Sequence, residues 1–171
     1  MEDWKGAGPF TAKIVDLETA GRRAAEARRA GRTVVLTNGC YDLMHAGHVH
    51  SLSQARAQGD FLVVGLNSDR SVRRLKGPER PLNNQRDRAV VLAAMEMVDL
   101  VVIFDDDTAC RLIETIRPHV YVKGADYNEQ TLPEAPTARA LGCRLHFVPL
   151  LPGTSTTSLL ERLRNTDPAD L

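Results

Sequence analysis

The sequence has few cysteines, no long apolar run and no net charge. Its three cysteines, Cys40, Cys110 and Cys143, stand far apart without a C-x-x-C spacing, so neither a zinc site nor a redox pair is indicated. No apolar run approaches the ~20 residues of a membrane helix, and no secretory signal is recognisable. The 22 basic and 22 acidic residues cancel, so no overall field attracts nucleic acid or a membrane. We therefore expect a cytoplasmic protein without such partners, whose anion binding is confined to a local site.

The composition is that of a globular protein. Of 171 residues, 43% are hydrophobic and 26% are charged. A chain of this length buries roughly 70% of the surface that its unfolded form exposes, so it needs no disulfide or metal to fold. We expect a single domain over residues 1–171, with 1–13 as a loose leader and 165–171 as a frayed tail.

Apolar runs alternate with helical patterns along the chain. The strand-like runs cover 33–37, 61–67, 100–104, 119–123 and 143–150. Helical patterns cover 16–30, 48–58, 83–97, 107–116, 133–141 and 155–164, the first with Asp16 as its cap. Continuously apolar strands, each followed by a helix, predict an α/β fold with a Rossmann-like, doubly wound, five-stranded parallel sheet, ordered 3-2-1-4-5. Ligands of such sheets bind at the carboxyl ends of the strands.

The loop after the first strand contains two histidines that open a helix. The residues of interest there are Asn38, Gly39, Cys40, Tyr41, Asp42, His45, Gly47 and His48. His45 and His48 share a helix face, and Gly47 lets a phosphate approach the free backbone N–H groups. Such donors suit phosphoryl-type transfer, where negative charge develops on the phosphate. An H-x-x-H spacing also occurs by chance, and zinc is disfavoured because no third ligand lies nearby in sequence.

Residues 34–48, VVLTNGCYDLMHAGH, resemble the signature of the nucleotidylyltransferase superfamily with the H-x-G-H motif. The form T-N-G-C-[FY]-D-[LI]-x-H-x-G-H is most similar to bacterial heptose-1-phosphate adenylyltransferases, in which the domain also exists fused to a sugar kinase. The resemblance covers roughly residues 14–164. It implies that His45 and His48 stabilise phosphate charge and that the other loop residues named above bind the nucleotide.

Basic residues follow the second strand, which ends at Asn67. The segment SVRRLKGPERP (71–81) predicts a mobile cationic loop. Without the resemblance it would be interpreted as an ordinary solvated surface loop. The heptose enzymes read V-N-S-D-x-S-V-R-x-L-K-G here, which implies that Lys76 contacts a phosphate. By its spacing to the third strand, Arg88 matches an arginine that the family uses near the phosphates; the alternative is a plain charge on a helix face.

The last two motifs lie after the fourth and fifth strands. Lys123, Gly124 and Asp126 match the K-G-G-D-Y of the heptose enzymes, which implies that Asn67, Gly124 and Asp126 lie near the nucleoside. Ala125 replaces the middle glycine and would be strained at positive φ. The run Thr154, Ser155, Thr156 and Thr157 caps a helix or forms a second anion site, where the family grips the β- and γ-phosphates of the triphosphate.

Two departures from related motifs bear on the substrates. Cytidylyltransferases often place an arginine shortly before the S-T-T motif, where this chain has Leu150-Leu151-Pro152, which favours the heptose branch. Residues 132–140, LPEAPTARA, do not match the V-V-G-type stretch of that branch, which leaves the acceptor sugar open.

The resemblance implies an adenylyltransferase that joins ATP and D-glycero-D-manno-heptose 1-phosphate to give ADP-heptose and pyrophosphate. It also implies a homodimer and a Mg²⁺ ion that arrives with ATP, without a dedicated metal site in the protein. Two alternatives stay open. One is a cytidylyltransferase acting on glycerol 3-phosphate or another sugar or alcohol phosphate, and the other is a sensor that binds a nucleotide without turning it over.

Overall fold

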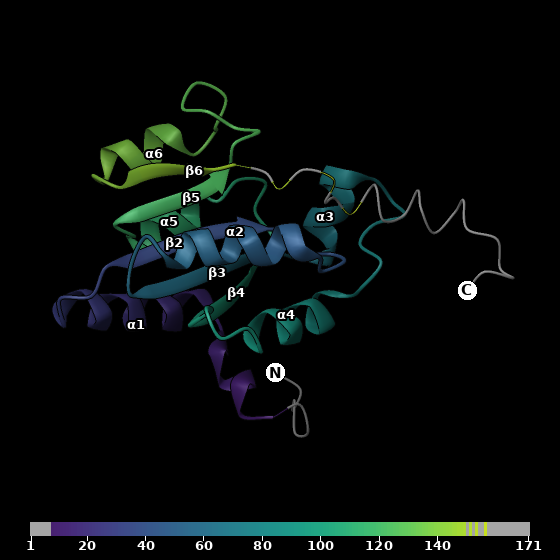
Figure 1. Ribbon diagram of the computed structural model, residues 1–171, viewed down its shortest axis with the longest axis horizontal. Helices are drawn as coiled ribbons and strands as arrows, with labels where there is room; N and C mark the ends of the chain where they lie inside the picture. The colour runs from purple at the N-terminus through teal and green to yellow at the C-terminus, as the bar shows by residue number, and fades with distance from the viewer. Residues whose placement is uncertain (1–7, 150, 152, 154–155, 157–171) are drawn as a thin grey trace, which may run out of the picture.

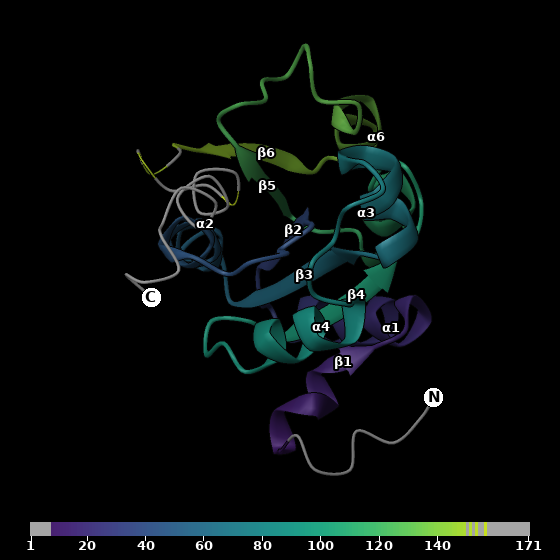
Figure 2. The ribbon, with the colours of Figure 1, turned by 90° about the vertical axis from the view of Figure 1, so that its right-hand side faces the viewer.

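The computed structural model describes residues 8–149, 151, 153 and 156, and its centre is a parallel sheet of six strands. The strands are β1 (Ile14–Val15), β2 (Val34–Gly39), β3 (Phe61–Asn67), β4 (Leu100–Phe104), β5 (Val120–Gly124) and β6 (Arg144–Val148). Their order in the sheet is β1-β4-β3-β2-β5-β6, which Figure 2 shows from bottom to top. The predicted order of the five longer strands is therefore confirmed.

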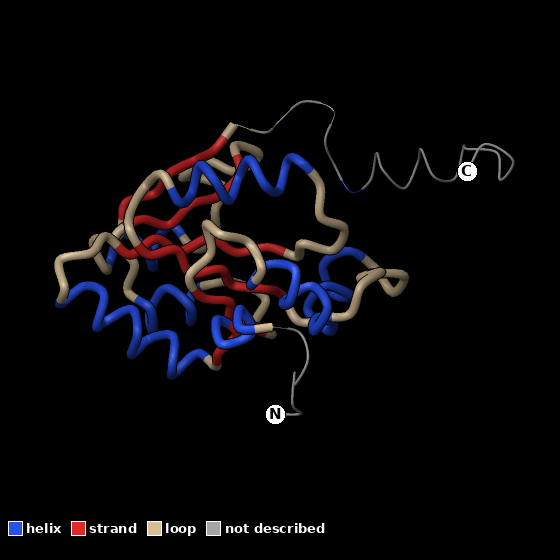
Figure 3. The backbone as a smooth tube through the Cα atoms, turned by 60° about the horizontal axis from the view of Figure 1, so that its bottom comes forward, coloured by secondary structure: helices blue, strands red, loops and turns tan. Residues whose placement is uncertain are grey.

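Helices enclose the sheet from both faces, as the tube in Figure 3 shows. The α-helices are α1 (Leu17–Arg29), α2 (Ala46–Arg56), α3 (Asp69–Lys76), α4 (Gln85–Ala93), α5 (Cys110–Ile116) and α6 (Ala135–Ala140). Buried residues of α1, α5 and α6 form one apolar core with the sheet, and those of α2 and α4 form a second. In β2, for example, Val34 and Leu36 enter the first core and Val35 the second, which explains why the strands are continuously apolar.

The prediction of five strands is wrong by one, because the two residues of β1 extend the sheet at its edge. Ile14 pairs with Val101 and Val15 with Val102, on the side of β4 that faces away from β3. Two residues are too few to show a period of two in the sequence. The strand forms because β4 would otherwise present unpaired backbone groups at the edge of the sheet.

The loose leader predicted for residues 1–13 is wrong for its last five residues. Pro9–Lys13 form a 3-10 helix, η1, whose Phe10 packs against the core beside α4. The Lys13 ammonium donates a hydrogen bond to the carbonyl oxygen of Met95 at 3.1 Å. Residues 1–7 lie outside the described part of the chain.

The mobile loop predicted for residues 71–81 is wrong for its first half, which belongs to α3. Ser68 caps this helix by accepting a hydrogen bond from the Ser71 N–H at 3.0 Å, and Asp69 places an acid in the first turn. Figure 1 shows α3 beyond the carboxyl ends of the strands. The helix predicted over 155–164 and the tail over 165–171 lie outside the described residues, apart from Thr156.

Within the part of the chain that the structure describes, no helix has the length and apolar character needed to cross a membrane.

Candidate active site

A cavity of about 800 Å³ opens where the carboxyl ends of four strands meet. Its lining includes the ends of β2, β3, β4 and β5, the first turns of α2, and α3. Strand β2 has β3 on one side and β5 on the other, so the cavity lies where the order of the strands reverses. This is the switch point at which a doubly wound sheet is expected to bind its ligand.

The two histidines of the motif lie together in this cavity. His45 is the N-cap of α2, and its Nδ1 accepts a hydrogen bond from the Gly47 N–H at 3.1 Å. The His45 and His48 rings stack with their centroids 3.8 Å apart. The predicted pairing of these side chains is therefore present, with His45 one residue before the helix and His48 in its first turn.

Burial keeps both imidazoles neutral at pH 7 in the absence of a ligand. It lowers the pKa of His48 to about 4, helped by the neighbouring His45 and opposed by the Leu43 backbone. Burial also lowers the pKa of His45. A neutral imidazole donates one N–H, and phosphate charge close by would favour its protonation.

Tyr41 forms the wall of the cavity next to the histidines. Its backbone adopts a left-handed conformation with φ of 46°, and its ring centroid lies 5.3 Å from that of His48. Gly39 makes this possible, because a Cβ at that position would lie 3.1 Å from the tyrosine ring. Burial raises the pKa of Tyr41 to about 12, so the phenol stays protonated at pH 7.

The resemblance assigns Asp42 to nucleotide binding, but the carboxylate of Asp42 binds other groups of the protein. Its side chain is only 2% exposed and pairs with Arg80 Nη2 at 2.7 Å. Its carboxylate also accepts hydrogen bonds from the N–H groups of Leu82 at 2.8 Å and Asn83 at 3.0 Å. Asp42 borders the cavity, but its carboxylate mainly ties residues 80–83 to the histidine loop.

Arg88 does not line the cavity, so the prediction that it contacts phosphate is not supported by its geometry. Its side chain has an exposed fraction of 0% and its Nη2 pairs with Asp69 at 2.8 Å. Its Nε donates to the Asn83 carbonyl at 3.0 Å, and its Nη1 donates to the Cys40 carbonyl. Arg88 thus joins the histidine loop, α3 and α4, and affects the site through them.

Lys76 and Lys123 bring positive charge into the cavity from two sides. Lys76 lines it from the last turn of α3, and its predicted contact with a phosphate stays a prediction. Lys123 lies at the end of β5, with its Nζ 3.3 Å from Asn38 Oδ1 and 4.8 Å from the centroid of the Tyr127 ring. Burial lowers the pKa of Lys123. The Tyr121 hydroxyl donates to the same Asn38 oxygen at 2.6 Å, which fixes the amide in place.

Two of the three residues expected near the nucleoside line the cavity. Asp126 lines the cavity on the β5 side, whereas Gly124 does not line it. Asn67 lines it from β3, on the opposite side of β2, and donates to Ser71 Oγ at 2.9 Å. Asn67 and Asp126 thus border the same cavity from opposite sides, and their placement near the nucleoside stays a prediction. Ala125 is not at positive φ, so replacement of a glycine there causes no strain.

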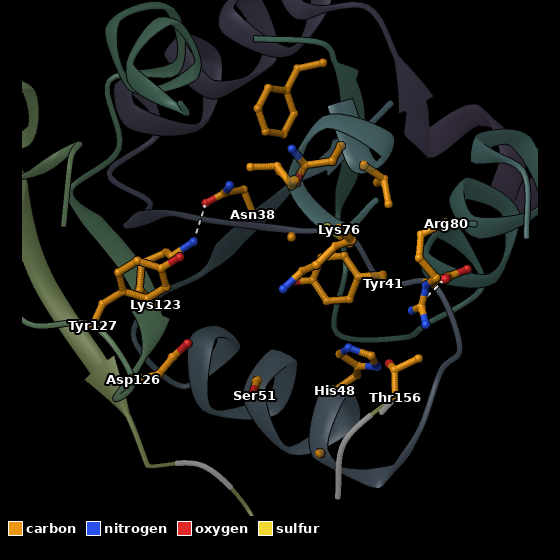
Figure 4. A pocket seen from close by; sticks show the side chains of 18 of the residues that line it. Asn38, Tyr41, His48, Ser51, Lys76, Arg80, Lys123, Asp126, Tyr127 and Thr156 are labelled. Carbon is orange, nitrogen blue, oxygen red and sulfur yellow. Dashed lines mark hydrogen bonds and ion pairs between the residues drawn. The ribbon is translucent and has the colours of Figure 1, made fainter. Parts of the chain in front are cut away.

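Thr156 lines the cavity near the histidine motif, as Figure 4 shows. Thr154, Ser155 and Thr157 lie outside the described residues. Sequence reasoning missed several lining residues, namely Ser51, Arg80, Tyr127, Pro133 and Glu134. Two of these carried a sequence signal, Arg80 as a cation between Gly77 and Pro81 in the predicted loop and Tyr127 as the last residue of the segment that matches K-G-G-D-Y. Glu134 is buried and accepts a hydrogen bond from the Ala109 N–H at 2.8 Å, a pairing between distant segments that periodicity does not predict.

A doubly wound sheet with paired histidines at its switch point defines an H-x-G-H nucleotidylyltransferase fold. The family model described as cytidylyltransferase-like matches residues 36–162, and the chain belongs to this family of nucleotidylyltransferases.

Two curated relatives are both named bifunctional protein HldE. The one from Syntrophotalea carbinolica is 52% identical over 136 residues, which are 80% of this chain and 28% of the relative. The one from Mesorhizobium japonicum is 50% identical over 159 residues, which are 92% of this chain and 32% of the relative. The chain thus spans about a third of the length of these relatives.

A solved structure with the same fold is the lipopolysaccharide core biosynthesis protein from Thermoplasma volcanium GSS1. It matches with a TM-score of 0.59 and 24% sequence identity, over 71% of this chain and 98% of that chain. At this identity the likeness supports the fold alone.

Proposed function

We propose that the chain is an adenylyltransferase that transfers AMP from ATP to D-glycero-D-manno-heptose 1-phosphate, giving ADP-heptose and pyrophosphate. The observation that carries the proposal is the stacked pair His45 and His48 in the cavity at the switch point. The relatives are named bifunctional and are much longer than this chain, which supports the proposal of an adenylyltransferase domain that also exists fused to a sugar kinase.

The proposed reaction needs no nucleophile from the protein. A phosphate oxygen of the acceptor attacks the α-phosphorus of ATP in line, a new P–O bond forms, and the bond to the β-phosphate breaks. Pyrophosphate leaves with the electron pair of that bond. His45 and His48 donate N–H groups to the developing charge, and Lys76 and Lys123 supply positive potential in a partly buried cavity.

Mg²⁺ is part of the proposal as an ion that ATP brings with it. Among the described residues, no group of three or more His, Cys, Asp or Glu side chains is placed to hold a metal ion. Phosphate oxygens and water suit Mg²⁺ as ligands, and the bound ion would neutralise charge on the leaving pyrophosphate.

The test is pyrophosphate release with Mg²⁺ from ATP and, separately, from CTP, each with a panel of sugar 1-phosphates and with glycerol 3-phosphate. Release from ATP with heptose 1-phosphate alone would support both substrates. Release from CTP, or with another acceptor, would keep the reaction class and overturn the proposed substrates. ATP binding without release for any acceptor would favour a nucleotide sensor.

The homodimer that the resemblance implies is also a proposal. Sedimentation equilibrium of the purified chain measures its mass in solution, and a value of 18.8 kDa at all concentrations would contradict it.

A further inference from the structure

Cationic side chains are few in the cavity. Among the described residues that line it, the lysines and arginines are Lys76, Arg80 and Lys123. The carboxylates of Asp107, Asp126 and Glu134 line the same cavity, so a triphosphate meets no uniformly positive surface. The position of each cation therefore decides which part of a nucleotide it contacts.

Arg80 lies on the same side of the cavity as the histidine motif. In Figure 4, Arg80, His48 and Thr156 lie on one side, and Lys123, Asp126 and Tyr127 lie on the other. Thr156 belongs to the Ser/Thr run that is expected to hold the β- and γ-phosphates.

The guanidinium of Arg80 is held in place but not saturated. Its side chain is 19% exposed, and its Nη2 donates to Asp42 Oδ2 at 2.7 Å. Its Nε is buried and has no hydrogen-bond partner among the described residues. Asp42 is fixed in turn by the backbone N–H groups of Leu82 and Asn83, so the arginine is oriented before any ligand arrives. A guanidinium that is fixed through one edge has N–H groups left for an anion.

We infer that Arg80, which lies beside His48 and Thr156 at the cavity, binds the β- and γ-phosphates of the nucleoside triphosphate. Asp42 acts as the positioning residue for Arg80. The inference deepens the proposed function and rests on nucleotide binding in this cavity, but it does not depend on which sugar phosphate is the acceptor.

Calorimetric titration of ATP, AMP and inorganic pyrophosphate with Mg²⁺ into Arg80→Met and Arg80→Lys variants tests the inference. AMP lacks the β- and γ-phosphates, so its affinity should stay within about twofold. Loss of a hydrogen bond to a charged group should weaken ATP and pyrophosphate binding by about 10- to 100-fold in Arg80→Met. Arg80→Lys keeps a cation beside Asp42 without the planar fork, so it should lose less.

The matched control is Arg139→Ala, which removes an exposed arginine of α6 that pairs with Glu129 away from the cavity. It should leave the affinity for all three ligands unchanged. If Arg80→Met does not fold, as judged by circular dichroism, the comparison rests on Arg80→Lys, whose charge still pairs with Asp42.

Two results would overturn the inference. One is equal weakening of ATP and AMP, which would mean that Arg80 only holds the loop in place. The other is unchanged ATP and pyrophosphate affinity in both variants. Failure of the proposed function looks different, because the unaltered chain would then bind no ATP or would release no pyrophosphate with any acceptor.

Discussion

At the scale of single residues, His48 combines burial with a position next to the reacting phosphates in the proposed mechanism. The ring is stacked on His45, and burial lowers its pKa to about 4. Two properties of this side chain can be measured separately, namely its contribution to turnover and its protonation when a nucleotide binds.

Replacement of His48 by alanine should lower kcat by about 10²- to 10³-fold, because one transition-state donor is lost. The fold should persist, since His48 belongs to neither of the two apolar cores. Steady-state pyrophosphate release measures kcat, and circular dichroism checks the fold. His50→Ala is the matched control, because His50 lies on the same helix but does not line the cavity. Near-full turnover in the His48 variant would remove this residue from the mechanism.

Nucleotide binding should be accompanied by proton uptake at about pH 5.5. The pKa of His48 is about 4 in the free protein, so the ring is neutral there, and the negative charge of the triphosphate raises that pKa. Between the two pKa values the complex holds a proton that the free protein lacks. Calorimetric titration of ATP in buffers of different ionisation enthalpy measures this uptake. It should be smaller in His48→Gln, and the same uptake in both proteins would exclude His48 as the group that takes up the proton.

At the scale of elements, α3 is attached to the loop after β4 by ion pairs. Arg70 and Arg74 both pair with Asp105, and Arg74 also pairs with Asp107 at 2.9 Å. The hydrogen bonds from Arg70 and Ser68 hold the pKa of Asp105 near 2. These contacts place the last turn of α3, and with it Lys76, at the edge of the cavity.

Arg88 connects three segments through one buried guanidinium, so its removal should affect stability first. Arg88→Met leaves the Cys40 and Asn83 carbonyls and the Asp69 carboxylate without their donor. Because Asp69 is partly exposed, we expect a loss of about 3 kcal/mol in the free energy of unfolding, at the low end for a broken buried pair. Urea denaturation measures it, with Arg139→Ala as the control expected to change by less than about 0.5 kcal/mol. Unchanged stability with weakened ATP binding would instead restore the predicted phosphate contact.

At the scale of the whole molecule, the stability of the fold should not depend on a metal ion, whereas the proposed activity should. Excess EDTA should abolish pyrophosphate release, and added Mg²⁺ should restore it, because the ion neutralises phosphate charge in the proposed reaction. The Tm without nucleotide should not change, since the metal is proposed to arrive with ATP. Differential scanning calorimetry with and without EDTA measures this. A lower Tm in EDTA would reveal a metal ion that belongs to the protein itself.

Much of the architecture follows from local sequence patterns. Five apolar runs predicted five of the six strands and their order, and the capping role of Asp16 is confirmed by its hydrogen bond from the Thr19 N–H at 2.7 Å. The histidine motif was equally readable, because His45, Gly47 and His48 lie within one loop and one helical turn. Backbone propensity and short spacing act over a few residues, so a sequence displays them directly.

The sequence by itself therefore determined the α/β class, the strand order and the histidine pair. Only the tertiary structure decided which of two arginines faces the cavity. Arg80 and Arg88 lie only eight positions apart in the sequence. In the folded chain Arg80 pairs with Asp42 at the cavity, whereas Arg88 is buried and pairs with Asp69 and two backbone carbonyl groups. Ile14–Val15 likewise form a strand only because they pair with the backbone of β4 at the edge of the sheet. In each case the partner is distant in sequence, so the outcome depends on packing rather than on any local pattern.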